Sequence, residues 1–352
     1  KEVNESYRLR ASFDLAYEIV TGLKIKSSLA IDYSMQDQNV FMPSNLDDNH
    51  NSYSSGRGQS NLMWLNENLL SYKKTFGMRH NLDVLLGLSF QEDRMKSRSG
   101  YGKGSSSDLI HYVTWNGNSY DTENNIQLKE YTSDLEESSM VGIFGRIAYN
   151  YKQKYYFSVT LRRDASSKFG ENTRWGTFTS YAFAYTFTEE PFMNWAKTFL
   201  DYGKLRLSYG KSGKQFESPY LAFGVLTTDI ITWHGNQGIT PFGNDGLLNP
   251  KLSWEETGQF DVGIDLDFFD HRFGIVCDYY YRYTDKLLTL VSLPGNYNAY
   301  MAQWQNAYAI SNQGVEFEIK ADIVRSEKLK WDLTFNVARN WNRLEKSNNG
   351  MD

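Results

Sequence analysis

The feature that most constrains this chain is an alternation of apolar and polar residues, which continues over segments of five to eleven residues. Residues 260–268 read FDVGIDLDF, and residues 315–323 read VEFEIKADI. Because successive side chains of a β-strand point to opposite faces, each segment predicts a strand with one apolar and one charged face. The alternation recurs at 9–19, 23–33, 82–90, 141–149, 155–161, 181–187, 205–209, 273–281 and 329–337. With a less regular segment at 61–72, the sequence predicts an all-β fold of about twelve strands.

The lengths of the connections distinguish two kinds of all-β protein, because soluble β-sandwiches and membrane barrels share this alternation. Short connections are expected at 20–22, 73–78, 150–154, 269–271 and 324–328. They alternate with long ones at 34–59, 92–138, 164–175, 212–256 and 288–311, and only 188–204 is longer than a simple turn on its side. Outer-membrane barrels have short periplasmic turns and long extracellular loops, so the pattern favours a transmembrane antiparallel β-barrel.

Composition agrees with this interpretation. Aromatic residues make up 16% of the chain, with 25 Tyr and 9 Trp, and such side chains suit the boundary between lipid and water. The net charge of −5 argues against a nucleic-acid partner. The single cysteine, Cys277, excludes a disulfide framework and a cysteine-based metal site. No run of 18 apolar residues is present to form a transmembrane helix.

The alternation assigns each side chain of a barrel strand to lipid or to the lumen. Val262, Ile264, Phe317 and Ile319 are expected to face lipid. The predicted lumen-lining residues are charged: Arg206, Asp261, Asp265, Asp267, Glu316, Glu318 and Lys320. We interpret them as a hydrated wall in which acids are balanced by bases, Arg282 among them. A cation site at Asp261, Asp265 and Asp267 is the alternative.

A second pattern combines a charged loop with the strands on either side of it. Residues 160–178 read TLRRDASSKFGENTRWGTF, in which a strand stops, ASSKFGENTR is expected to form a loop in water, and WGTF begins the next strand. The segment LRRDASSKFGENTRWGTFTS resembles the SusC/RagA family of TonB-dependent transporters of Bacteroidota. The phrases FTEEPFMNW, LRLSYGKSG, NPKLSWEETGQFDVGIDLDFFDHRF, DYYYRYTDKLL and NAYAISNQGVEFEIKADI follow in the family's order, so the resemblance is dense over 138–342. Ala165 and Thr179 depart from residues that are common in the family.

The resemblance implies a multi-pass outer-membrane protein with a 22-stranded barrel and an N-terminal plug. It further implies import of oligosaccharides or peptides, with energy delivered through TonB and with a SusD-like surface lipoprotein as partner. Nothing in the sequence matches a plug or a TonB box, so residues 1–352 are expected to form part of a single barrel domain, in its middle portion. The expected topology runs from an extracellular Lys1 to an extracellular Asp352, with an edge open to further strands at each end.

The sequence contains no convincing catalytic or cofactor motif, and an enzyme is not predicted. The GKS at 210–212 lacks the first glycine of a phosphate loop, because Leu205 stands there. The five histidines show no metal-ligand spacing, so each is interpreted as a loop or turn residue.

Aromatic residues in the three longest loops are the candidate ligand-binding residues, because flat rings stack on sugars and bracket peptides. They are Trp115, Tyr120, Tyr220, Trp233, Tyr297, Tyr300 and Trp304. The alternative for each is packing within the loops or against a covering protein.

Two functions from different classes fit these observations. The first is an active importer, and the second is a SusC-like barrel that serves as a structural or interaction platform in the envelope. A plug and a TonB box elsewhere in the protein would favour the importer. A soluble carbohydrate-binding sandwich is a more distant third hypothesis.

Overall fold

The fold is given by a computed structural model of the 352-residue chain. The structure describes residues 1–48, 51–103, 107–109, 111–113, 120–121, 126–127, 129–223, 226–233, 236–241, 248–293 and 302–347. Among these residues, no helix is long and apolar enough to cross a membrane.

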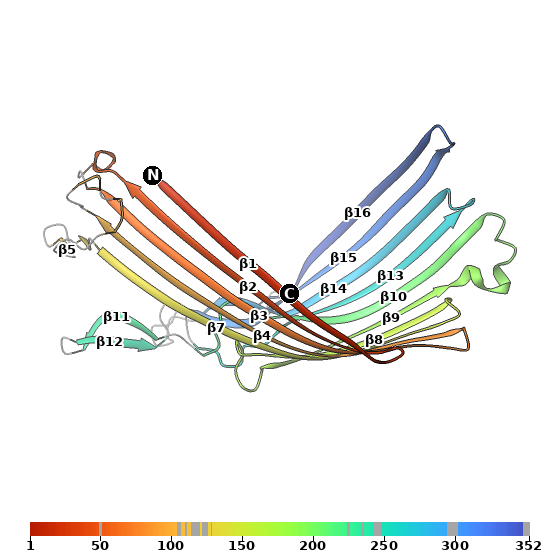
Figure 1. Cartoon of the computed structure of the whole chain (residues 1–352), viewed down its shortest axis with the longest axis horizontal. Coiled ribbons are helices and arrows are strands. Elements are labelled where there is room, and N and C mark those ends of the chain that lie inside the picture. The colour runs from red at the N-terminus through yellow and green to blue at the C-terminus, as the bar shows by residue number, and fades with distance from the viewer. Residues whose placement is uncertain are drawn as a thin grey trace. The chain divides into compact units, whose positions relative to one another are not determined.

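Twelve strands form one sheet in sequence order, β1-β2-β3-β4-β7-β8-β9-β10-β13-β14-β15-β16 (Figure 1). The strands are β1 (Glu2–Val20), β2 (Leu23–Met42), β3 (Tyr53–Phe76), β4 (His80–Lys103), β7 (Lys129–Tyr151), β8 (Tyr155–Ser166), β9 (Trp175–Thr186), β10 (Leu200–Lys214), β13 (Glu255–Phe268), β14 (Phe273–Ser292), β15 (Ala302–Arg325) and β16 (Lys330–Lys346). Two short hairpins lie in the connections, β5 (Tyr120–Asp121) with β6 (Ile126–Gln127) and β11 (Leu226–Trp233) with β12 (Asn236–Pro241). The all-β prediction and the number of strands are confirmed.

The connections alternate in length as the sequence predicts. Turns of a few residues at 21–22, 77–79, 152–154, 269–272 and 326–329 alternate with longer connections at 43–52, 104–128, 167–174, 215–254 and 293–301. The tight turns need left-handed backbone, which Gly22 supplies at φ +87°, and Lys152 and Gln153 also adopt at φ 53° and 55°. The connection between β9 and β10 is the long exception, and it contains η2 (Phe187–Glu189) and η3 (Pro191–Met193).

The strands are longer than the alternation predicts, so the expected loop boundaries are wrong in several places. The twelve strands of the sheet contain 12 to 24 residues, and β4 and β7 extend into the two ends of the 92–138 region, which the sequence predicts as loop. Likewise, β14 and β15 occupy much of 288–311. The extensions of β4 and β7 are largely polar on both sides, as in Lys96-Ser97-Arg98, so the sequence carries little period-two signal there.

The chain divides into two compact units, each described separately. Unit 1 comprises Lys1–Leu15, Ser27–Glu67 and Ser89–Met140, and unit 2 comprises Ala16–Lys26, Asn68–Leu88 and Val141–Asp352. In unit 1, Arg8 and Arg10 of β1 both pair with Asp32 of β2, at 2.6 and 3.0 Å. The charged side chains of these two strands therefore meet on one face.

Unit 2 shows the separation of faces most clearly. The register places Leu205, Ile264, Cys277, Phe317 and Val337 opposite one another across β10, β13, β14, β15 and β16. The next row of the sheet, one residue away along each strand, contains charged and small residues. The sheet therefore has an apolar face, which includes Val262, Ile264, Phe317 and Ile319, and a polar face.

This separation leads to a test of the lipid-facing assignment. In the full-length protein reconstituted in lipid, Ile264→Arg should cost about 2 to 4 kcal/mol of folding free energy, because it places a charge in the middle of the bilayer. The matched change on the polar face, Asp265→Asn, should cost no more than about 1 kcal/mol. Urea unfolding of both variants is the measurement. Equal destabilisation at the two positions would contradict the assignment of the faces.

Candidate functional site

The candidate site is a network of charged side chains on the polar face of β10, β13 and β14. The register puts Arg206 opposite Gly263, and Gly263 opposite Asp278. Asp265 is two residues farther along β13 than Gly263, so its side chain shares their face. One arginine is therefore within reach of carboxylates on two other strands.

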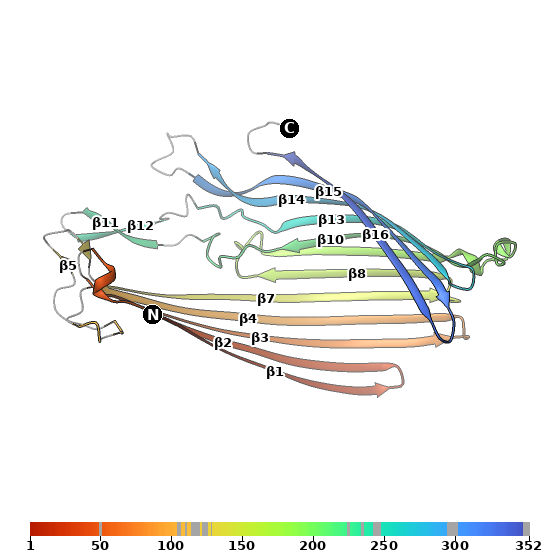
Figure 2. The same cartoon turned by 90° about the horizontal axis from the view of Figure 1, so that it is seen from above.

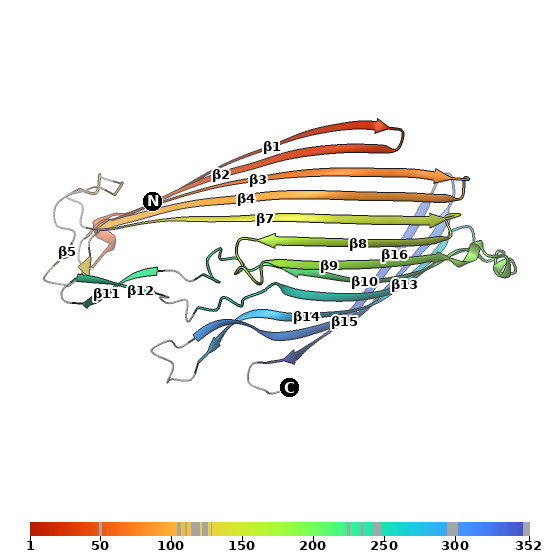
Figure 3. The same cartoon turned by 90° about the horizontal axis from the view of Figure 1, so that it is seen from below.

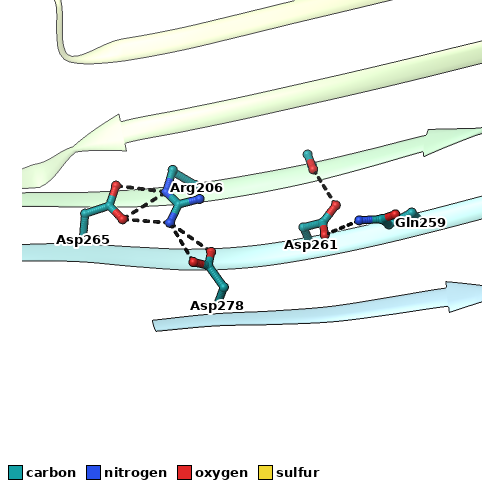
Figure 4. Close-up of polar contacts among 6 residues, drawn as sticks. Arg206, Gln259, Asp261, Asp265 and Asp278 are labelled. Carbon is teal, nitrogen blue, oxygen red and sulfur yellow. Dashed lines mark hydrogen bonds and ion pairs between the residues drawn. The ribbon is translucent and has the colours of Figure 1, made fainter. Parts of the chain in front are cut away.

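Arg206 makes a two-pronged contact with Asp265 and a further contact with Asp278 (Figure 4). Its Nε donates to Asp265 Oδ2 at 2.9 Å, and its Nη2 donates to Asp265 Oδ1 at 2.7 Å. The same Nη2 lies 2.9 Å from Asp278 Oδ1. This geometry uses the rigid donor fork of the guanidinium, which a lysine lacks.

A second chain of hydrogen bonds lies beside the first. Asp261 accepts from Ser208 Oγ at 3.0 Å and from Gln259 Nε2 at 2.7 Å. Arg282 in turn donates to Gln259 Oε1 through Nε and Nη2, at 3.0 and 2.9 Å. The negative charge of Asp261 is thus stabilised by neutral donors, and Arg282 is joined to it through an amide.

Gly263 makes the three-strand contact sterically possible. A Cβ atom added at Gly263 would lie 2.1 Å from Asp278 Oδ1 and 2.7 Å from Arg206 Nη2. Any larger residue would therefore occupy the space that the guanidinium crosses. Sequence reasoning missed this role, because the glycine simply appeared as a neutral member of the polar set.

A hollow of about 810 Å³ adjoins this network within unit 2. Its polar-face lining includes small side chains from several strands, namely Ala148, Ser158, Ala182, Ala184, Ser208 and Gly263. Charged and aromatic groups surround these small residues, among them Asp83, Arg146, Tyr156, Arg206 and Asp261. The surface is thus indented where small residues meet, and both signs of charge are available around the indentation.

The remaining predicted lumen-lining residues lie on the same polar face. Lys320 pairs with Glu318 of its own strand at 2.6 Å, and Asp267 lies 3.1 Å from the ring of His271. Glu316 stands opposite Asp278 in the register. His271 is a turn residue, as predicted, and it also contacts the carboxylate of Asp267. That the polar face lines a lumen stays a prediction.

The predicted aromatic ligand residues are only partly placed. Trp115, Tyr297 and Tyr300 lie outside the described residues, and Tyr120 and Trp233 lie in the hairpin strands β5 and β11. Tyr220 and Trp304 are half-buried, and the carbonyl oxygen of Trp304 accepts from Asn249 Nδ2 at 2.8 Å. Their ligand-binding role stays a prediction.

The segment ASSKFGENTR is only partly the hydrated loop that the sequence predicts, because Glu171 and Asn172 are exposed whereas its middle is buried. Phe169 is 0% exposed, and its ring lies 4.8 Å from the ring of Phe216 and 4.7 Å from that of Trp254. Leu252 is also fully buried, and Trp254 contacts the ring of Phe178. We call Phe169, Phe178, Phe216, Leu252 and Trp254 the loop core. It joins the 167–174 connection and strand β9 to both ends of the 215–254 connection.

Polar groups of the motif hold this loop core in place. Lys168 Nζ donates to the carbonyl oxygens of Phe216 and Glu217, and Ser166 Oγ donates to Gln215 at 2.7 Å. Thr173 Oγ1 donates to the Leu252 carbonyl at 2.7 Å. The buried carboxylate of Asp164 accepts from Arg162 Nε at 2.7 Å. Two of the charged side chains, Lys168 and Arg162, therefore bond to backbone carbonyls and to a buried acid.

One feature of the sequence indicates the loop core, namely the phenylalanine inside the polar loop. An aromatic residue in the middle of a polar loop, as in Ser-Lys-Phe-Gly, has few reasons to be exposed. The partners Phe216, Leu252 and Trp254 lie about 47 to 85 residues further along the chain, so no local pattern identifies them.

The site offers ion pairing, hydrogen bonding and an indented polar surface. Within the described residues, no group of three or more His, Cys, Asp or Glu side chains is arranged to hold a metal ion. The charged and hydrogen-bonding groups described above can make reversible contacts with water and polar solutes.

The fold and this polar face together define the class of protein to which the chain belongs. An antiparallel sheet of long strands, apolar on one face and charged on the other, with short turns alternating with long connections, is the wall of a transmembrane β-barrel. The family model described as "TonB dependent receptor-like, beta-barrel" matches residues 2–351. The chain belongs to this family, and the resemblance to SusC/RagA transporters is confirmed.

Two relatives and one solved structure show the extent of the match. The chain is 31% identical over 350 residues to "TonB-dependent receptor P3" of Formosa agariphila, covering 97% of this chain and 33% of the relative. It is 28% identical over 346 residues to "TonB-dependent receptor SusC" of Bacteroides thetaiotaomicron, covering 96% of this chain and 33% of that protein. The RagAB peptide importer in its open-open state shares the fold with a TM-score of 0.87 at 23% identity, covering all of this chain and 37% of that one. The chain thus spans about a third of the length of the curated relatives it matches.

The close fit at Gly263 generates a prediction. Gly263→Ala should destabilise the full-length protein, because its methyl group displaces Arg206 or Asp278. In an Arg206→Ala, Asp278→Ala background, the same change should cost little, and this non-additivity in unfolding free energy is the measurement. Gly258→Ala on the same strand is the control, since its Cβ meets only Tyr209 Oη at 3.7 Å. Additive effects would show that the network does not depend on Gly263.

The loop core leads to a second prediction, which concerns the stability of the connections. Phe169→Ala should remove about 3 to 5 kcal/mol from local stability, because it empties a fully buried site. Hydrogen exchange of the full-length protein should then show faster amide exchange at 165–174 and 249–254. Phe223→Ala, at a residue that is 48% exposed, is the control and should leave these rates unchanged. Similar exchange in both variants would mean that Phe169 does not organise the loops.

Proposed function

We propose that this chain forms part of the barrel wall of an outer-membrane active importer of oligosaccharides or peptides. The observation that carries the proposal is the polar face of unit 2, where acids and arginines are paired across strands beside an indented surface. Such a face remains hydrated without presenting a strong field of one sign, and it suits the inner wall of a wide barrel. The opposite apolar face suits outer-membrane lipid.

The family supplies the energy source and the partners of this proposal. A barrel wide enough for such solutes needs a plug, and directional uptake needs a plug that an energised partner can move. We assign these roles to a plug and a TonB box in the complete protein, with TonB as the partner. The solved neighbour named a peptide importer, RagAB, supports peptides as one substrate class, and the relative named SusC supports the same transport architecture.

The long connections are proposed to contact a SusD-like surface lipoprotein and part of the substrate. They are 104–128, 215–254 and 293–301, and they carry the aromatic candidates together with parts of the adjoining strands. The loop core supports this role, because it fixes the base of the 215–254 connection to the end of β8. A fixed base limits the positions available to the rest of a loop.

Uptake by cells is the test of the importer. Cells that carry the full-length protein should accumulate a labelled oligosaccharide or peptide, and deletion of the TonB box should abolish accumulation. Trp233→Ala and Trp304→Ala should reduce uptake if these rings contact substrate. Surface abundance of each variant, measured by antibody, controls for expression.

Each outcome has a separate meaning. Uptake that is unaffected by the deletion would remove the importer and favour the platform hypothesis. Loss on deletion with no effect of the tryptophan changes would retain the importer and show that the ligand residues are elsewhere.

A further inference from the structure

The connection between β9 and β10 differs from the other turns at its end of unit 2. It covers residues 187–199, whereas the turns at 152–154, 269–272 and 326–329 have three or four residues. Figures 2 and 3 show it beyond the ends of β9 and β10, at the same end as the turn between β13 and β14. A barrel needs only a short turn there, so the extra residues require another explanation.

The segment is folded, and its inner side is already packed. Ala196 is 1% exposed and Leu200 is 6% exposed. Thr188 is buried and its Oγ1 accepts from the Gly203 amide at 3.1 Å. Leu200 N donates to the Ala196 carbonyl at 2.8 Å, which closes the final turn. The outward side chains are therefore held in position by an ordered backbone.

Two large aromatic side chains point outward from this ordered segment. Phe192 is 63% exposed and Trp195 is 70% exposed. The residues between and beside them include Glu189, Asn194 and Lys197, so polar and aromatic groups are mixed. This mixture suits the headgroup layer of a bilayer, where rings enter the acyl boundary and polar groups stay in water.

An aromatic row on the apolar face leads directly into the segment. The rings of Tyr151 and Tyr155 are 6.3 Å apart, those of Tyr155 and Tyr185 are 5.1 Å apart, and those of Tyr185 and Phe187 are 6.5 Å apart. Phe187 lies against Gly203, where an added Cβ would be 2.4 Å from its Cζ. This row is the expected aromatic belt at the edge of the lipid-facing band.

Hydrogen bonds fasten the segment to that same face. Tyr155 Oη donates to Glu190 Oε1 at 2.7 Å, and Lys154 Nζ donates to the Glu189 carbonyl. The neighbouring turn is joined as well, since Phe269 N donates to the Phe199 carbonyl at 3.1 Å. Phe269 is itself 59% exposed, so the apolar surface continues across two connections.

We propose that residues 187–199 form an interfacial anchor, in which Phe192 and Trp195 insert among phospholipids of the inner leaflet of the outer membrane. The occupant is the lipid surface, because the segment continues the aromatic row of the apolar face. The inference rests on the proposed membrane location of the chain. It explains why one periplasmic connection is long.

The test places a fluorescent probe beside the rings without replacing them. In the full-length protein, with Cys277 and any other cysteine changed to Ser, Asn194→Cys is labelled with the environment-sensitive dye NBD. The protein is reconstituted in vesicles of phosphatidylethanolamine and phosphatidylglycerol that carry a nitroxide either at the headgroup or deep in the acyl chain. Aqueous iodide on both sides of the bilayer is the third quencher.

The expected result is strong quenching by the headgroup nitroxide, weak quenching by the deep nitroxide and protection from iodide. Adding Phe192→Ala and Trp195→Ala should shift the NBD emission to longer wavelength and restore quenching by iodide. Labels at Ile264→Cys and Glu171→Cys are the controls for lipid and for water.

Two results would overturn the anchor while leaving the membrane location intact. One is quenching of the Asn194 label by iodide alone, unchanged by the two alanine substitutions. The other is protection from all three quenchers, which would indicate that protein covers the segment. If the Ile264 label is also reached by iodide and by no lipid nitroxide, the proposed membrane location itself is wrong.

Discussion

Antiparallel pairing at a fixed register is the constraint on which the rest of this structure depends. Because side chains alternate along each strand, the register decides which residues of neighbouring strands share a face. In unit 2 it aligns Leu205, Ile264 and Cys277 on one face and Arg206, Gly263 and Asp278 on the other. The apolar face, the charge network and the hollow beside it all follow from this alignment.

The strands could be predicted from the sequence because the middle part of each one alternates apolar and polar side chains. Ile264 beside Asp265, and Phe317 beside Glu318, show this alternation residue by residue. The outer ends of the strands could not be found in this way. Around Lys96 and Arg98 both faces are polar, so pairing continues where the pattern stops.

In the candidate site too, local sequence patterns identify some residues, whereas their partners depend on contacts between distant segments. The acids of 261–267 were identified from their alternation, whereas the choice of Asp265 and Asp278 as partners of Arg206 depends on a register that no single segment encodes. Phe169 presents the stronger case. Its ring packs on Phe216 and Trp254, which reach it only when the 167–174 and 215–254 connections fold together.

Gly263 has a consequence for how the sheet selects one register among several. A slip of two residues between β10 and β13 preserves the alternation, so the apolar and polar faces would still be separated. It would, however, place Asp261 or Asp265 opposite Arg206 instead of Gly263, and a carboxylate side chain would fill the path of the guanidinium to Asp278. Only in the observed register does the space left by the missing side chain of Gly263 lie opposite Arg206. Gly263 therefore favours this register over two-residue slips that the hydrophobic pattern alone would allow equally well.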